Sequence, residues 1–347
     1  MAGKAEQAAS IYQELVQKFP NNPELRVDLC VAHYKAGHYK ASADAAKAAL
    51  KVHPELPAAN LFLGASYLQL GEFGAAIPPL QKALEEQPGD RNARIALAEA
   101  LSGARRYKEA AEQFQKLSEI IPDSPRVWYG LGQCYEKLSE QATAQSDHYR
   151  ELAQQAYRRL EQLPRSPESY IHAAELREKN SEWVEAANQW RAALALAPHD
   201  ERARAGLAWA LYRARDYRAA LEVIEQLRKD GLDSAVLNFL NGGCWLNLQQ
   251  PEKSIQYLEK AIASDSGFLP AKAALGQALL QTGKAREAIP LLRAALSVDE
   301  DGTIHFQLYR AYAISGEAEA AKQALSDYEE FKKGSSQPAT ASGNAYH

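Results

Sequence analysis

The sequence predicts an all-α protein, a solenoid in which repeated pairs of helices stack one after another. Two recurrences and the helical patterning within each period carry this prediction. Prolines that close Ala- and Leu-rich amphipathic runs recur every 34 residues, at Pro20, Pro54, Pro88 and Pro122. The same shift aligns a leucine column that is followed each time by a Cys, Gly or Ala, with its leucines at Leu29, Leu63, Leu97 and Leu131. A fixed period of this length indicates stacked structural repeats.

One repeat, residues 57–90, shows how each pair of helices is built. A first amphipathic stretch begins at Pro57 and breaks at Gly71, and a second begins near Phe73 and stops before Pro88. Apolar residues in both stretches are spaced three and four apart, which is the spacing of one face of an α-helix. Two such helices joined by a tight turn form an αα-hairpin.

Small residues set how closely the two helices of a pair approach. Gly64 lies in the first predicted helix and Ala76 in the second, and neither has a side chain large enough to hold the backbones apart. We therefore expect a bulky side chain at Ala76 to wedge the hairpin open. In the eighth repeat, which starts at Ala235 when the N-terminal half repeat is counted as the first, Gly242 and Gly243 thin the first helix, so we expect looser packing there.

The period divides the chain into a half repeat, nine full repeats and a tail. Residues 1–22 form an N-terminal half repeat with a second helix only, and residues 23–333 form the nine repeats. The repeat at 125–166 is extended, and we expect its second helix to begin early. Residues 334–347 have no apolar periodicity and should be disordered. The full repeats start at Pro23, Pro57, Arg91, Pro125, Pro167, Glu201, Ala235, Leu269 and Gly302.

Composition excludes several classes of protein. The chain has 40 Lys+Arg and 44 Asp+Glu, so it lacks the basic excess of a nucleic-acid binder. No apolar run approaches the roughly 18–20 residues of a membrane-spanning helix, so we expect a soluble protein. The N-terminus has no apolar core of the signal-peptide type, and the sequence as written predicts a cytoplasmic protein. Two interpretations of the half repeat stay open: it caps the array, or a longer natural chain precedes Met1, which would allow a periplasmic or secreted protein.

The sequence contains no motif for catalysis or for a cofactor. It lacks a Gly-rich phosphate loop, an HExxH, a GxSxG and an EF-hand pattern. Cys30, Cys134 and Cys244 have no CxxC spacing and fall in predicted first helices, so we expect buried thiols. His33 and His38 flank a predicted turn and should not face one metal ion. We therefore predict a non-enzymatic protein with no cofactor and no metal site.

The order of residues within each period resembles the tetratricopeptide repeat: leucine and a small residue, an aromatic three positions on, glycine at the turn, an aromatic two later, alanine and a closing proline. The resemblance covers about residues 3–332. It implies a right-handed α–α superhelix whose first helices line a concave groove, with the second, fifth, ninth, twelfth and thirteenth residues of each repeat facing it. This rule gives the groove residues Tyr34, Lys35, Leu61, Arg126, Tyr129, Gln133, Arg202, Trp209, Tyr212, Arg213, Phe239 and Leu246.

The neighbourhood of Trp209, Tyr212, Arg213 and Phe239 is the strongest candidate for binding. Exposed aromatic residues interleaved with arginine are the residue types that anchor protein interfaces. The alternative is that these rings pack between adjacent repeats.

The resemblance implies a scaffold for protein–protein interaction, whose groove holds a peptide or a helix of another protein. Two alternatives stay open. The chain binds nucleic acid through the arginine cluster at 202–218, which the overall charge disfavours, or it is a non-catalytic subunit of a larger enzyme or secretion assembly. Neither the identity of the partner nor the oligomeric state follows from the sequence.

Overall fold

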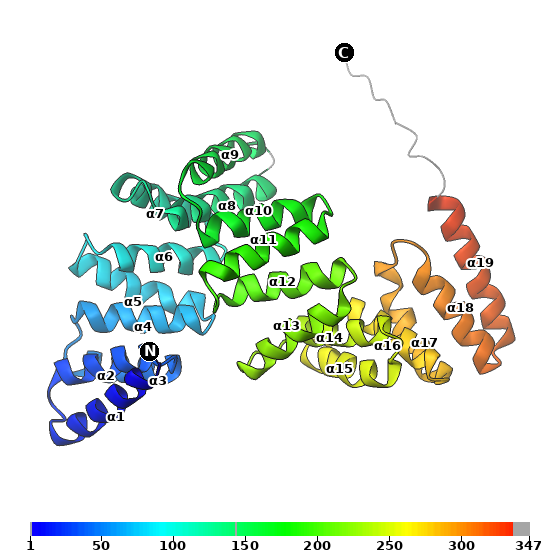
Figure 1. The fold of residues 1–347 in the computed structure, drawn as a ribbon, viewed down its shortest axis with the longest axis horizontal. Coiled ribbons are helices and arrows are strands. Elements are labelled where there is room, and N and C mark those ends of the chain that lie inside the picture. Colours follow the sequence, from blue (N-terminus) through cyan, green and yellow to red (C-terminus); the bar gives the residue numbers. More distant parts are fainter. Residues whose placement is uncertain (1, 143, 336–347) are drawn as a thin grey trace, which may run out of the picture. The chain divides into compact units, whose positions relative to one another are not determined.

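The computed structural model describes residues 2–142 and 144–335 of the chain. The chain divides into two compact parts, the N-terminal part (Met1–Ser169) and the C-terminal part (Tyr170–His347), and each is described by itself. Every regular element within the described residues is a helix, as Figure 1 shows. The predicted all-α fold class, a solenoid of helical repeats, is confirmed.

In the N-terminal part each helix packs against the next one along the chain (Figure 1). Its helices are α1 (Ala2–Lys18), α2 (Pro23–Lys35), α3 (Tyr39–Val52), α4 (Pro57–Gln69), α5 (Phe73–Glu86), α6 (Arg91–Gly103), α7 (Tyr107–Ile120), α8 (Pro125–Gln141) and α9 (Ser146–Gln162).

The C-terminal part continues the alternation of helices. Its first helix, α10, begins three residues before the division between the parts. The helices are α10 (Pro167–Lys179), α11 (Trp183–Leu196), α12 (Glu201–Arg213), α13 (Tyr217–Lys229), α14 (Ala235–Asn247), α15 (Pro251–Ser264), α16 (Leu269–Gln281), α17 (Ala285–Ala295), α18 (Thr303–Ser315) and α19 (Ala318–Ser335), with the 3-10 turn Leu296–Val298 after α17.

The two helices of a pair pack closely because small residues lie where they meet. A Cβ atom placed on Gly64 of α4 would lie 2.4 Å from Cγ of Leu80 on α5 and 3.0 Å from the backbone oxygen of Ala76. Ala76 itself is completely buried. The same alanine column is completely buried in other pairs, at Ala110, Ala186 and Ala220. The contact leaves no room for a larger side chain on either helix.

In most pairs the turn between the two helices has a left-handed backbone at one position. Gly37, Gly71 and Gly283 adopt it with φ between 73° and 82°. Four other turns place a non-glycine residue at the equivalent position, with φ between 59° and 64°, at Arg105, Ser181, Arg215 and Gln249. L-residues with a Cβ adopt this conformation at a cost, so these four turns are held by their surroundings.

The extension of the repeat at 125–166 is shared between its two helices. Both α8 and α9 have 17 residues, whereas α4 has 13 and α5 has 14. The longer α9 agrees with the expected early start of the second helix, and the structure adds that α8 is lengthened as well. Ser146 Oγ donates a hydrogen bond to the backbone oxygen of Ser139 at 2.9 Å, which ties the start of α9 to the added turn of α8.

The packing of α14 corrects the expectation of a loose eighth repeat. A Cβ on Gly242 would lie 2.6 Å from Cγ of Leu258, and one on Gly243 would lie 2.9 Å from the ring of Tyr212. Ser254 Oγ donates to the backbone oxygen of Gly242 at 2.7 Å. The two glycines allow neighbouring side chains to approach the backbone of α14, and the helix is tightly packed at this point.

Three further expectations concern termini, membranes and metals. The helix α19 extends to Ser335, and the remainder of the expected tail, residues 336–347, lies outside the described residues. Across residues 2–142 and 144–335, no helix combines the length and apolarity that a bilayer crossing requires. The same residues contain no cluster of three His, Cys, Asp or Glu side chains that could hold a metal ion.

Candidate functional site

Half of the predicted groove residues lie in the N-terminal part. Tyr34 packs edge-on against Tyr39 and Phe62, with ring centres 5.5 and 5.4 Å apart, and Lys35 is exposed. Leu61 is partly buried against the core. Tyr34, Lys35 and Leu61 line neither of the two hollows described below nor the one beside Phe19.

Tyr129 presents little surface to a partner. Its side chain is buried, with 6% of its surface exposed, and Gln133 Nε2 donates to its hydroxyl at 2.9 Å. The position rule predicts the face of a helix but not the depth of a side chain, and Tyr129 belongs to the core.

Arginines at the second position of a repeat pair with glutamates at the ninth position of the preceding repeat. Arg126 donates from Nε and Nη2 to the two carboxylate oxygens of Glu99, at 2.6 and 2.8 Å. Arg202 Nη2 donates to Glu175 Oε1 at 2.5 Å. Each pair joins consecutive first helices, so the predicted groove charges are partly neutralised by the protein itself.

A hollow of about 430 Å³ lies in the C-terminal part beside Trp209. We call it the Trp209 groove. Three first helices, α10, α12 and α14, contribute all but two of its lining residues, and Trp190 comes from the second helix α11. The groove is lined by Glu175, Glu178, Trp190, Arg202, Ala205, Gly206, Trp209, Ser234, Val236, Leu237 and Leu240.

Gly206 brings Trp190 to the groove. A Cβ on Gly206 would lie 2.5 Å from the indole of Trp190, so only glycine lets this ring reach past α12. Trp190 Nε1 donates to Glu178 Oε1 at 2.7 Å. Burial raises the pKa of Glu178, and the hydrogen bond from Trp190 offsets this only in part. The groove therefore combines two indole rings with a half-buried carboxylate.

Arg213 lies between two tryptophans next to the groove. Its guanidinium carbon is 4.1 Å from the ring centre of Trp183 and 5.6 Å from that of Trp209. A guanidinium in this position is attracted by the electrons of both ring faces. The arrangement fixes the orientation of Trp209 while Arg213 stays exposed.

The other predicted rings pack among the helices. Tyr212 contacts Phe239 with ring centres 6.1 Å apart, and Phe239 contacts Phe268 at 5.2 Å. Burial raises the pKa of Tyr212 to about 12. Leu246 is buried, with 4% of its surface exposed. For Tyr212, Phe239 and Leu246 the alternative of packing between repeats describes the structure, whereas Trp209 and Arg202 line the groove.

Among the groove residues that the sequence analysis missed, Glu175, Glu178 and Trp190 were missed for different reasons. The run that contains Glu175 and Glu178 is typical of a solvated face, yet the side chain of Glu175 is only 25% exposed. Glu175 is the ninth residue of its repeat, so the position rule could have found it. Trp190 lies on a second helix, outside the rule. The sequence signal for Trp190 is Gly206, a small residue in the first helix of the next repeat that leaves room for a large ring.

Comparisons with known proteins agree with the geometry. The family description "Tetratricopeptide repeat" matches residues 123–300, and further matches cover residues 1–22, 27–91 and 67–134. The TPR repeat-containing protein YpiA of Bacillus subtilis (strain 168) is 26% identical over 80% of this chain and 64% of its own length. The small glutamine-rich tetratricopeptide repeat-containing protein 2 of Mycosarcoma maydis is 29% identical over 32% of each chain. The chain thus spans less than two thirds of these relatives.

A solved structure shows the same fold. The chain aligns to the crystal structure of the APC/C hetero-tetramer Cut9-Hcn1 with a TM-score of 0.60 and 16% identity, over 82% of this chain and 55% of the other. At that identity the likeness concerns the fold alone. The 34-residue period, the paired helices and a family match over more than half of the sequence lead to one conclusion: the chain belongs to the tetratricopeptide repeat family.

Proposed function

We propose that this protein is a non-enzymatic scaffold that binds a peptide or a helix of a partner protein in the Trp209 groove. Tetratricopeptide repeat proteins generally bind other proteins, and the chain's membership of that family supports an interaction scaffold. The observation that carries the proposal is the groove itself, where Trp209 and the 51% exposed side chain of Val236 border the same hollow. Exposed apolar surface in a concave site is what a partner side chain can bury.

The chemistry of the groove favours a segment with an apolar or aromatic side chain and a polar flank. Trp209 and Val236 offer apolar surface above the buried side chains of Trp190 and Leu240, whereas the pair of Arg202 with Glu175 supplies polar groups at the same site. An apolar centre with a polar rim is the common anatomy of protein interfaces. A partner would bury its apolar side chain against Trp209 and Val236, and its polar groups would face the ion pair.

The arginine cluster at 202–218 gives weak support to nucleic-acid binding. Arg202 pairs with Glu175, and Arg204 pairs with Asp230. Arg213 lies over two indoles. Guanidinium groups already engaged by carboxylates and rings are poorly placed to neutralise a row of phosphates. This argument favours a protein partner over a polynucleotide.

Replacing Trp209 with alanine tests the proposal. We expect the variant to lose about 2 kcal/mol or more of binding free energy, roughly 30-fold in affinity, because a central tryptophan is a typical interface hot spot. Affinity capture with wild type, Trp209→Ala and Leu196→Ala measures this. Leu196 is 53% exposed on α11 and lines neither hollow of the C-terminal part, so it serves as the control.

Circular dichroism must accompany the capture experiment. If Trp209→Ala captures the same proteins as wild type, the groove is not the binding site. If it loses helicity instead, the ring belongs to the core, and the proposal is wrong for a different reason.

A further inference from the structure

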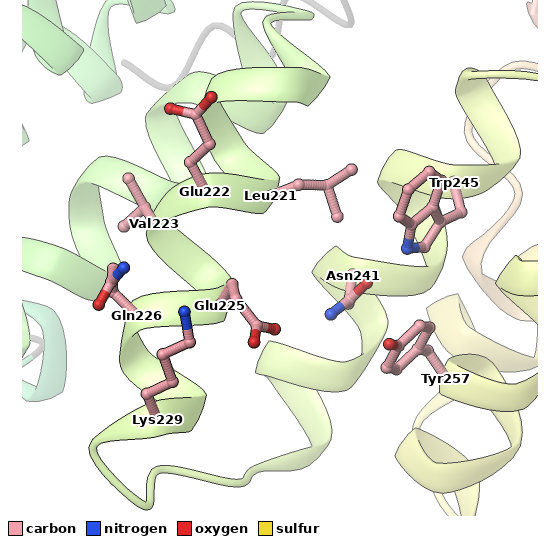
Figure 2. Close-up of a pocket in the computed structure, with 9 residues that line it drawn as sticks. All are labelled: Leu221, Glu222, Val223, Glu225, Gln226, Lys229, Asn241, Trp245 and Tyr257. Atoms are coloured by element: carbon pink, nitrogen blue, oxygen red, sulfur yellow. The ribbon is translucent and has the colours of Figure 1, made fainter.

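A second hollow, of about 690 Å³, lies in the C-terminal part between α13 on one side and α14 with α15 on the other. We call it the Asn241 hollow. Figure 2 shows its residues on the facing helices. It shares no lining residue with the Trp209 groove. The hollow is lined by Leu221, Glu222, Val223, Glu225, Gln226, Lys229, Asn241, Trp245 and Tyr257.

Asn241 interrupts the leucine column of the repeats. It is the seventh residue of its repeat, and the equivalent residues in other repeats include Leu29, Leu63, Leu97, Leu131, Leu207, Leu275 and Leu308. Its side chain is buried, with 3% of its surface exposed, and its Oδ1 has no hydrogen-bond partner. An unsatisfied buried carboxamide destabilises a fold, so its presence at a leucine position points to a role other than packing.

Other uncharged polar groups accompany Asn241. Figure 2 shows the indole of Trp245 and the phenol of Tyr257 on the α14–α15 side of the hollow. Gln226 on α13 adds a second carboxamide to the lining. Such a set offers both donors and acceptors of hydrogen bonds next to two aromatic rings.

The charges around the hollow disfavour a cationic ligand. Lys253 Nζ already lies 4.4 Å from the ring centre of Trp245, and the guanidinium carbon of Arg228 lies 5.2 Å from that of Tyr257. Lys229 also lines the hollow, and its positive charge offsets part of the negative charge of Glu222 and Glu225. Because the rings of Trp245 and Tyr257 already have cations beside them, a ligand is not needed to supply one. The group without a partner is Asn241, which an uncharged polar ligand can pair with.

We propose that the Asn241 hollow is a second peptide-binding site, which takes an extended segment of a partner protein by its main chain. A carboxamide is complementary to a peptide group, because it can accept a hydrogen bond from an N–H and donate one to a C=O. In a helical segment these groups bond within the helix, whereas an extended segment presents them outward. Asn241 Oδ1 is buried, so the side chains that cover it must move aside; an extended segment then satisfies Asn241 without needing a particular side chain.

Selection from a random dodecapeptide library displayed on phage tests this site. The intact chain is immobilised as wild type, as Asn241→Leu and as Trp209→Ala. Asn241→Leu restores the residue of the column, so we expect it to fold with an unchanged or higher melting temperature. Among the peptides enriched on wild type, one class should bind Trp209→Ala equally and Asn241→Leu about tenfold more weakly or worse, since one hydrogen-bonded pair is lost.

Main-chain recognition is tested on the enriched peptides themselves. N-methylation of one peptide bond at a time should abolish binding at one or two positions, where replacement of the side chain by alanine has a smaller effect. Equal binding to wild type and Asn241→Leu, peptides that depend only on Trp209, or no enrichment would overturn the proposal. If Asn241→Leu does not fold, Asn241→Ala takes its place, and failure of both to fold would assign Asn241 to the core and overturn it as well.

Discussion

Individual glycines, which have no Cβ atom, decide how closely the helices of a pair approach. Gly64 and Gly74 belong to the same pair of helices, α4 and α5, but have opposite surroundings. A Cβ on Gly64 would lie 2.4 Å from Leu80, whereas a Cβ on Gly74 would meet no atom within 4 Å. The sequence pattern predicted the close approach at Gly64 and Ala76, because small residues recur at these two positions in most repeats.

These two glycines provide a matched pair of substitutions. We expect Gly64→Ala to lower the free energy of unfolding by about 1–3 kcal/mol, because Leu80 must shift out of its packed position. Gly74→Ala should raise it by about 0.5–1 kcal/mol, because alanine restricts the unfolded chain and meets no obstacle. Urea unfolding of both variants measures the difference. A destabilised Gly74→Ala or an unaffected Gly64→Ala would show that the helices do not pack as described.

The three cysteines illustrate a residue-level prediction that is confirmed. Cys30, Cys134 and Cys244 are free and buried, each in the first helix of its pair. Burial raises the pKa of Cys30 and Cys134 to about 11 and that of Cys244 to about 12. Such thiols are largely protonated at neutral pH and serve as small apolar residues in the packing.

At the scale of the element, the turn between paired helices depends on a left-handed residue more than on glycine itself. The breaks at Gly37 and Gly71 are visible in the sequence, because glycine reads as a helix stop. The equivalent positions Arg105 and Gln249 carry no such signal, yet they adopt the same conformation. Residue propensity predicts the turns that contain glycine. Where the residue is not glycine, the packing of the two helices imposes the left-handed conformation.

The turn at Gln249 should therefore be improved by glycine. We expect Gln249→Gly to raise the free energy of unfolding by about 1 kcal/mol, because the strain of a left-handed L-residue is relieved. Gly283→Ala, at the equivalent turn of the next repeat, should lower it by a similar amount. A Cβ there meets no atom within 4 Å, so that loss reports the backbone alone. Thermal unfolding of the two variants should show shifts of opposite sign, and shifts of equal sign would contradict the account of these turns.

The extended repeat shows a limit of sequence patterning at this scale. The apolar periodicity is the same whether the added residues belong to α8 or to α9, so it does not predict which helix is longer. The structure places a further turn on α8, where the backbone oxygen of Ser139 accepts a hydrogen bond from Ser146 Oγ on α9. That contact depends on three-dimensional packing, which a linear pattern does not contain.

At the scale of the whole chain, the fold class follows from the 34-residue period alone, whereas the site follows only in part. The position rule leads to Arg202 and Trp209, which line the Trp209 groove. The rule does not predict how deeply a side chain is buried, so it also selects Tyr129 and Leu246, which are buried. It also omits Trp190, which reaches the groove from a second helix. The sequence analysis missed the Asn241 hollow because it followed the positions that recur, and Asn241 is a single exception at a position where leucine recurs.

The central claim is that the chain is a linear array in which each helix is stabilised by its immediate neighbours. Stability in such an array is approximately a sum of local terms, so a local defect should stay local. Hydrogen–deuterium exchange of wild type and Gly64→Ala, followed by mass spectrometry, tests this directly. We predict faster exchange in α4, α5 and the helices next to them, with unchanged protection in α14 to α17. A uniform loss of protection over the whole chain would contradict the account.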